Sequence, residues 1–146
     1  MKTGIMVKGF SAGVLTFISY LLNGWDTALQ TLCLFMVIDF VTGILKGIIN
    51  KELNSHTCLK GIVKKCCYFL LVIVAVALDR LYPEAQGLVR TLVCYFLVAT
   101  DGISILENIA LCGVTYPKFL KNILEQLKDK SDEGTGLVEK SENKEL

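Results

Sequence analysis

Charged residues are scarce in this chain, and their scarcity argues against the surface of a soluble domain. Only 20% of the 146 residues are Asp, Glu, Lys or Arg, whereas 53% are hydrophobic. The charges concentrate between apolar runs and at the C-terminus, whereas a soluble domain spreads them over most of its surface helices. The net charge of +1 gives no electrostatic basis for binding nucleic acid.

The chain also lacks the residue patterns of metal and catalytic sites. Its single histidine is His56, and none of the six cysteines forms a C-x-x-C pair, so the spacing argues against a zinc site. Most of the cysteines lie within apolar runs, where they are typical packing residues. There is no nucleophile elbow, Walker loop, HExxH motif or dinucleotide fingerprint. We therefore expect a protein that is not an enzyme and holds no metal or cofactor.

What the chain does have is long apolar runs. Residues 27–49, 66–82 and 88–113 are close to the length of about 20 residues that a membrane-spanning helix needs. A weaker run, residues 4–22, carries Lys8 and several hydroxyl side chains, so it either spans the membrane or lies in the interface as an amphipathic helix. No cleavage site follows it, and we expect it to be retained. The sequence predicts an all-α membrane protein with three to four transmembrane helices.

The C-terminal part differs in character from this transmembrane domain, which we place at residues 1–116. Residues 117–130 predict an amphipathic cytoplasmic helix that begins at Pro117 and lies on the membrane or pairs with a copy of itself. Its apolar face holds Phe119, Leu120, Ile123, Leu124 and Leu127. Residues 131–146 are charged and nearly free of large apolar side chains, which predicts a disordered tail.

The positions of the basic residues predict the orientation of the chain in the membrane. The polar stretch 50–65 holds Lys51, Lys60, Lys64 and Lys65, which favours a cytoplasmic loop, and the turns at 23–26 and 82–87 then lie outside. The C-terminus is predicted to be cytoplasmic. Four spans satisfy every loop, and three spans with an interfacial first helix remain the alternative. Met6 follows Met1 closely, which leaves a second translation start open beside an ordinary internal methionine.

Two polar stripes interrupt the apolar runs. On a helix over 27–49, one side carries a row of polar and small residues, namely Asp39, Thr42, Gly43, Lys46 and Gly47. A carboxylate in the middle of a membrane helix is costly and indicates a functional site, and the Gly-xxx-Gly pair favours close helix approach. The second stripe, on 88–113, consists of Arg90, Asp101, Ser104 and Asn108.

The two stripes support two interpretations. They line a water-accessible path or an oligomer interface, or they form internal ion pairs, with Arg90 placed near the membrane edge as a headgroup anchor. In a monomer, Asp39 and Asp101 would be hidden against each other or against Lys46 and Arg90. In an oligomer, they would turn toward an aqueous lumen. Asp79-Arg80 is interpreted as a local interfacial pair that ends the third run.

Three short stretches resemble a known family. They are Asp39-Phe40-Val41-Thr42-Gly43, the segment from Asn54-Ser55 to Lys64-Lys65, and Ser104-Ile105-Leu106-Glu107-Asn108 followed by Cys112-Gly113 and Pro117-Lys118-Phe119-Leu120. Their order and spacing, over roughly residues 30–130, are similar to those of the toxin-secretion and phage-lysis holins of clostridia and of phages of Gram-positive bacteria.

This resemblance implies a protein that accumulates in the bacterial cytoplasmic membrane, forms homo-oligomers and opens lesions through which an endolysin or a toxin leaves the cytosol. It implies that the motif residues act in assembly. Two alternatives remain: a small oligomeric ion channel or pinholin, whose polar stripes form a narrow conduction path, and an antiholin-type membrane regulator, whose charged tail recruits a partner.

Overall fold

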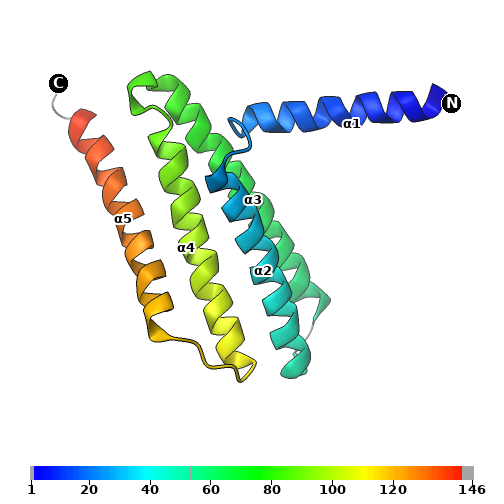
Figure 1. The fold of residues 1–146 in the computed structure, drawn as a ribbon, viewed down its shortest axis with the longest axis vertical. Coiled ribbons are helices and arrows are strands. Elements are labelled where there is room, and N and C mark those ends of the chain that lie inside the picture. Colours follow the sequence, from blue (N-terminus) through cyan, green and yellow to red (C-terminus); the bar gives the residue numbers. More distant parts are fainter. Residues whose placement is uncertain (1, 53, 143–146) are drawn as a thin grey trace.

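The computed structural model describes residues 2–52 and 54–142, and the elements in these ranges are helices without a strand. They are α1 (Lys2–Leu21), α2 (Thr27–Ile49), α3 (Ser55–Leu81), the short 3-10 helix η1 (Pro83–Ala85), α4 (Leu88–Leu111) and α5 (Lys118–Glu142). Figure 1 shows α2, α3, α4 and α5 side by side as a bundle, with α1 projecting away from one end. The prediction of an all-α protein is confirmed.

Three helices are long and apolar enough to cross a membrane: α2, α3 and α4. The bounds of α2 coincide with the predicted run at 27–49. α1 contains a shorter apolar segment, Ser11–Leu21, and its described side chains from Ser11 to Tyr20 are exposed. α1 projects away from the bundle in Figure 1 and meets it at its last turn, where Arg80 stacks on Tyr20. A fourth span and an interfacial helix therefore both remain predictions.

The centre of the bundle is α4, which packs against α2, α3 and α5. The core joins side chains of three helices, with Leu29 and Leu32 from α2, Val72 from α3, and Cys94 and Leu97 from α4. The outward surfaces of α2 and α3 expose large apolar side chains, among them Leu34, Val37, Leu70 and Val74. In a bilayer such surfaces lie against lipid tails, which are as apolar as the side chains themselves.

Two elements are longer than the sequence predicts. α3 begins at Ser55, so the predicted loop over 50–65 is wrong for residues 55–65; the Asn54 side chain caps this helix by accepting a hydrogen bond from the His56 backbone N–H at 2.9 Å. α5 runs beyond Lys130 to Glu142, so residues 131–142 are helical here where the sequence predicts a disordered tail. No proline follows Pro117 to break the helix.

α5 packs lengthwise along α4 of its own chain, an arrangement different from the membrane surface or second copy expected for it. The two helices approach closely at Gly102, where an added Cβ would lie 2.8 Å from the methyl carbons of Leu124 and 3.1 Å from the Phe35 ring. Farther along, the Lys128 ammonium lies 5.4 Å from the centre of the Phe96 ring. Ser131 is buried, and its hydroxyl donates to the Leu127 carbonyl.

The close approach at Gly102 gives a first prediction. Gly102→Val places a branched side chain where only hydrogen fits, and such overpacking typically costs about 1–3 kcal/mol. We expect α5 to loosen from α4 and trypsin to cleave the α5 lysines several-fold faster in detergent-solubilised protein. The matched control is Gly13→Val, since a Cβ at Gly13 meets no atom within 4 Å. Equal cleavage of both variants and the parent would contradict the packing.

Candidate functional site: a buried charge network across three helices

A buried ion network joins the three apolar helices at the middle of the bundle. The Lys65 ammonium of α3 lies 2.7 Å from Asp39 Oδ2 of α2 and 2.5 Å from Asp101 Oδ2 of α4. The Asp101 side chain is fully buried, and those of Lys65 and Asp39 are 13% and 12% exposed. Because buried charges are tolerated only when paired, this cation holds the three helices in one register.

The same network extends along the contact between α2 and α4. The Asn108 amide nitrogen donates a long hydrogen bond to Asp39 Oδ1 at 3.5 Å and another to the Thr42 hydroxyl oxygen at 3.4 Å. A Cβ at Gly43 would lie 3.8 Å from that nitrogen, an ordinary van der Waals contact, so Gly43 adjoins the Asn108 side chain. The Thr42 hydroxyl itself donates to the Ile38 carbonyl at 2.9 Å.

The structure thus unites members of both predicted stripes, namely Asp39, Thr42, Gly43, Asp101 and Asn108. Among the described residues, the contacts of this network include none from Lys46, Gly47 or Ser104; Gly47 is buried, and the other two are half-buried. The cations expected beside the carboxylates were Lys46 and Arg90. The cation that the structure places there is Lys65.

Sequence reasoning missed Lys65 because it assigned this residue to a cytoplasmic loop. A signal was present, since Lys65, Tyr68, Val72 and Val76 follow one another at helical spacing and the last three are buried. Extending the helix toward the N-terminus by this spacing places the lysine on the buried face of α3. Its ammonium also lies 5.1 Å from the centre of the Tyr68 ring, within cation–π range.

The network holds more negative than positive groups. One ammonium faces two carboxyl groups, and the Tyr68 hydroxyl interacts with the buried carboxyl group of Asp101. Two carboxylates without their shared cation would repel each other. The arrangement therefore depends on Lys65 more than on any other side chain in it.

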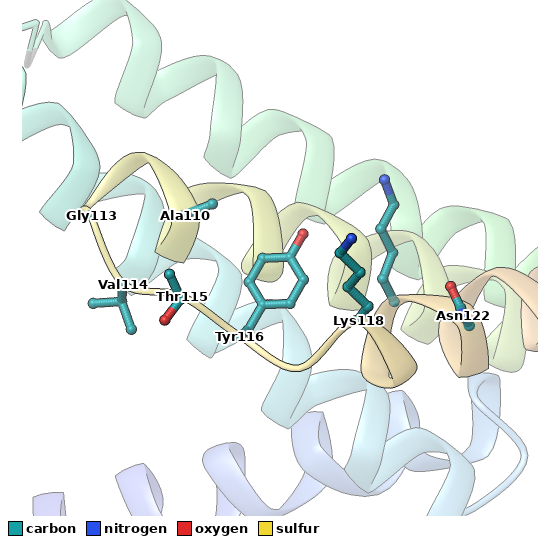
Figure 2. Close-up of a pocket in the computed structure, with 8 residues that line it drawn as sticks. Ala110, Gly113, Val114, Thr115, Tyr116, Lys118 and Asn122 are labelled. Atoms are coloured by element: carbon teal, nitrogen blue, oxygen red, sulfur yellow. The ribbon is translucent and has the colours of Figure 1, made fainter.

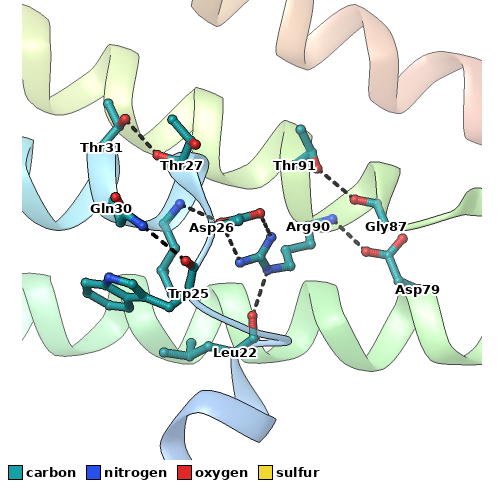
Figure 3. A network of polar contacts seen from close by, with 11 residues as sticks. Leu22, Trp25, Asp26, Thr27, Gln30, Thr31, Asp79, Gly87, Arg90 and Thr91 are labelled. Carbon is teal, nitrogen blue, oxygen red and sulfur yellow. Dashed lines mark hydrogen bonds and ion pairs between the residues drawn. The ribbon is translucent and has the colours of Figure 1, made fainter.

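A second polar network lies at the N-terminal end of α4, around Arg90 (Figure 3). Arg90 is 3% exposed, and its guanidinium donates to both Asp26 carboxylate oxygens at 2.6 and 3.0 Å and to the Leu22 carbonyl at 2.7 Å. Asp26 also caps α2 by accepting from the Leu29 N–H at 3.0 Å. The hydrogen bonds from Arg90, with that from Leu29, hold the pKa of Asp26 below its ordinary value. Of the interpretations of Arg90, the structure shows the internal ion pair.

Asp79 and Arg80, near the end of α3, connect α3 to the start of α4 and to the end of α1. Asp79 accepts hydrogen bonds from the backbone N–H groups of Val89 and Arg90, at 3.1 and 2.9 Å, and so caps the first turn of α4. The Arg80 guanidinium donates to the Tyr20 carbonyl at 2.9 Å and stacks 4.5 Å from the Tyr20 ring. The interpretation of Asp79-Arg80 as a local pair is therefore wrong, because each side chain contacts a different helix.

An open groove of about 540 Å³ lies where α4 ends and α5 begins (Figure 2). Tyr116, Lys118 and Asn122 line it from the connection and from α5, and Lys121, which also lines it, lies 3.7 Å from Glu125. Residues 110 and 113–115 complete its wall. The groove marks the basic end of α5, at the same end of the bundle as the α2–α3 connection.

Three apolar helices joined by a buried charge network define a multi-pass membrane protein. The sequence model of the bacteriophage holin family matches residues 16–129, which include the whole of α2, α3 and α4. The chain therefore belongs to the bacteriophage holin family, as the resemblance of its motifs indicated.

Individual relatives agree with this membership. The chain is 44% identical to an uncharacterized 14.9 kDa protein in the nagH 3' region of Clostridium perfringens, over 89% of this chain and 94% of the relative. It is 39% identical to an uncharacterized protein of Clostridium acetobutylicum, over 77% of this chain and 90% of the relative. It is 34% identical to a probable holin of Bacillus phage phi105, over 73% and 78% of the two chains. No solved structure matches the chain.

The central network gives a second prediction. Lys65→Met removes the shared cation and leaves Asp39 and Asp101 facing each other, and breaking a buried ion pair on one side costs about 3–5 kcal/mol. We expect a large fall in the thermal midpoint of the purified protein in detergent. Lys64→Met is the matched control, because Lys64 is exposed and lies beside Lys65. A Lys65→Met protein as stable as the control would show that the network does not hold the helices.

The Arg90 network gives a third prediction, on pH. Because the pKa of Asp26 is lowered in the folded protein, its pairing stabilises the fold above the unfolded pKa, and that contribution is lost as the pH falls through the folded value. We expect Asp26→Asn to lower stability at pH 7, and the difference from the parent to shrink upon acidification below about pH 4. Thermal unfolding in detergent between pH 3 and 7 measures this, and a difference that stays constant with pH would refute it.

Proposed function

We propose that this protein is a holin that accumulates in the bacterial cytoplasmic membrane, assembles with copies of itself and opens lesions through which an endolysin or a toxin leaves the cytosol. The observation that carries the proposal is the family match across the whole α2–α4 bundle. The relative from Bacillus phage phi105, a probable holin, supports it. In this proposal the protein has no catalytic residue, cofactor or metal.

The single chain is suited to accumulate without opening the membrane. Its ionised groups at mid-depth are paired inside the bundle, as the Lys65 network shows. Its outward surfaces on α2 and α3 are apolar, so they need no partner in lipid. Permeability must therefore arise from an assembly of copies rather than from a channel through the monomer.

The predicted site residues enter this proposal as assembly residues. Asp39, Thr42, Gly43, Asp101 and Asn108 fix how α2 and α4 pack, and this packing sets the shape of the surface that each copy presents to the next. Lys46, Gly47, Arg90 and Ser104 belong to the same two helices and are proposed to act in the same way. Lining of a lumen by Asp39, Asp101 or Arg90 would require the networks to open, because Asp101 and Arg90 are buried and Asp39 is 12% exposed in this structure.

For the orientation, we propose that the end of the bundle with the α2–α3 and α4–α5 connections faces the cytosol. Lys51, Lys60, Lys118 and Lys121 lie at or near this end, in agreement with the preference of basic residues for the cytoplasmic side. α5 then runs back along α4 (Figure 1), and this packing does not support the predicted cytoplasmic position of the C-terminus.

The fourth prediction tests the function directly. Inducible expression of the protein in a bacterium, together with a cytosolic endolysin that lacks an export signal, should cause an abrupt fall in turbidity and release of the endolysin into the medium. Each protein expressed alone serves as a control. The holin should arrest growth without the loss of turbidity that cell-wall degradation produces.

The other outcomes identify the alternatives. Depolarisation without release of the enzyme would contradict the holin proposal and favour a small-pore channel or pinholin. Normal growth, with delayed lysis when a known holin is expressed alongside, would contradict it in favour of an antiholin-type regulator. The variant Lys65→Met, with its presence in the membrane fraction checked, shows in the same assay whether release needs the intact network.

A further inference from the structure

The groove between the end of α4 and the start of α5 (Figure 2) lies at the level of lipid head groups. α4 has 24 residues and is therefore about 36 Å long, whereas the hydrocarbon core of a bilayer is about 30 Å thick. Ala110, in the last turn of α4, lines the groove together with the connection that follows it. A groove at the end of a spanning helix is therefore within reach of the head groups.

The side chains that line this groove carry positive charge. Its eight lining residues include Lys118 and Lys121 and no acidic residue. Figure 2 shows the Tyr116 hydroxyl and the Lys118 ammonium on the same side of the connection. Among the described residues, neither of these two groups has a hydrogen-bond or ion-pair partner. Both are therefore available as donors to a ligand.

Two acidic side chains lie outside the groove, about one helical turn away from it. Glu125 is 3.7 Å from Lys121, whose side chain stays 43% exposed, and Glu107 is exposed on α4, three residues before Ala110. Because α5 runs back along α4, both carboxyl groups are displaced from the groove toward the middle of the bundle. An anion in the groove would meet the lysines first, and Glu125 would weaken its binding by competing for Lys121.

Exposed apolar surface adjoins these basic side chains. Val114, which also lines the groove, is 57% exposed, and Leu111 in the preceding turn is 55% exposed. A phospholipid has the same division, with a charged phosphate next to apolar chains. The tyrosine is also typical of this depth, since its ring is apolar and its hydroxyl polar. A small anion dissolved in water would match the lysines and leave the apolar part of this surface uncovered.

We propose that this groove binds the phosphate of an anionic phospholipid, with the Lys118 and Lys121 ammonium groups and the Tyr116 hydroxyl as its donors. Lysine binds phosphate as a point charge, and a basic pocket between helices at the cytoplasmic surface suits an anionic head group. The bound lipid fixes the α4–α5 connection at the membrane surface. The inference goes beyond the proposed function, because a holin, a channel and a membrane regulator would all carry this site equally.

The experiment measures lipid binding to the full chain in a zwitterionic detergent. A phosphatidylglycerol with a fluorescent acyl chain is titrated with the purified protein, and its anisotropy gives the dissociation constant. Unlabelled phosphatidylglycerol, phosphatidylcholine and inorganic phosphate then compete with it. We expect phosphatidylglycerol to displace the fluorescent lipid at a concentration at least tenfold lower than either of the other two.

A double variant tests whether the groove is the site. Each basic residue near a charged lipid contributes about fivefold to binding, so Lys118→Gln with Lys121→Gln should weaken the binding of phosphatidylglycerol at least tenfold. Lys51→Gln with Lys60→Gln is the matched control, because it removes the same charge at the same end of the bundle from two exposed side chains outside the groove. We expect the control to bind within about twofold of the parent.

A third variant acts in the opposite direction. Glu125→Gln releases Lys121 from its ion pair and should tighten binding about two- to fivefold, which is the range of an exposed pair. This variant keeps the proposal testable if the double lysine variant does not fold, because a gain in affinity requires folded protein. Unchanged or weaker binding by Glu125→Gln would overturn the assignment of Lys121 as a donor.

The remaining results also decide between occupants. Equal competition by phosphatidylcholine would show that the acyl chains alone are bound, and equal competition by inorganic phosphate would show a site for a soluble anion; either result overturns the proposal. Equal losses in the two double variants would show diffuse attraction in place of a site. Because no step of this assay involves release of an endolysin, its outcome is independent of whether the protein opens lesions.

Discussion

The Lys65 ammonium lies between the carboxyl groups of Asp39 and Asp101, and the rest of the bundle depends on this contact. Each of the three groups comes from a different helix, so none of the helices can slide or rotate without separating buried charges. In a membrane the apolar side chains do not supply this order, because they are equally well solvated by lipid. The polar contacts therefore determine which helix faces are turned inward, and packing refines the arrangement that they impose.

α4 is central because it takes part in both charge networks. Asp101 joins it to the middle of α2 and α3, and Arg90 joins its first turn to Asp26 at the start of α2. The two contacts lie about three helical turns apart, a separation that fixes the relative tilt of α2 and α4 as well as their register. Among the described side chains, the last turn of α1 meets the bundle at Tyr20, which contacts Arg80, and Leu22 just after it accepts a hydrogen bond from Arg90.

The sequence was sufficient to predict the features of a single helix, namely its bounds and the residues that share a face. Apolar length predicted the bounds of α2, and helical spacing brought Asp39, Thr42 and Gly43 to one face, as the structure has them. What it did not provide is the partner of each charge, because pairing depends on how separate helices lie together. Lys65 was missed since a pair of lysines beside an apolar run resembles the end of a span, and the polar first turns of α3 hide the start of the helix.

If copies of this protein open a lesion, part of each copy must face water. A lesion needs a polar surface as long as the membrane is thick, and the Lys65 and Arg90 networks do not provide it while they are paired inside the bundle. α5 exposes Asn122, Glu125 and Asp129 along one side, and exposed Gln126 and Lys130 lie on the side of Phe119 and Ile123. It is not among the helices apolar enough to span. A polar flank that is unfavourable beside lipid becomes favourable when neighbouring copies enclose water against it, so the surface that a single chain cannot satisfy is one that an assembly can.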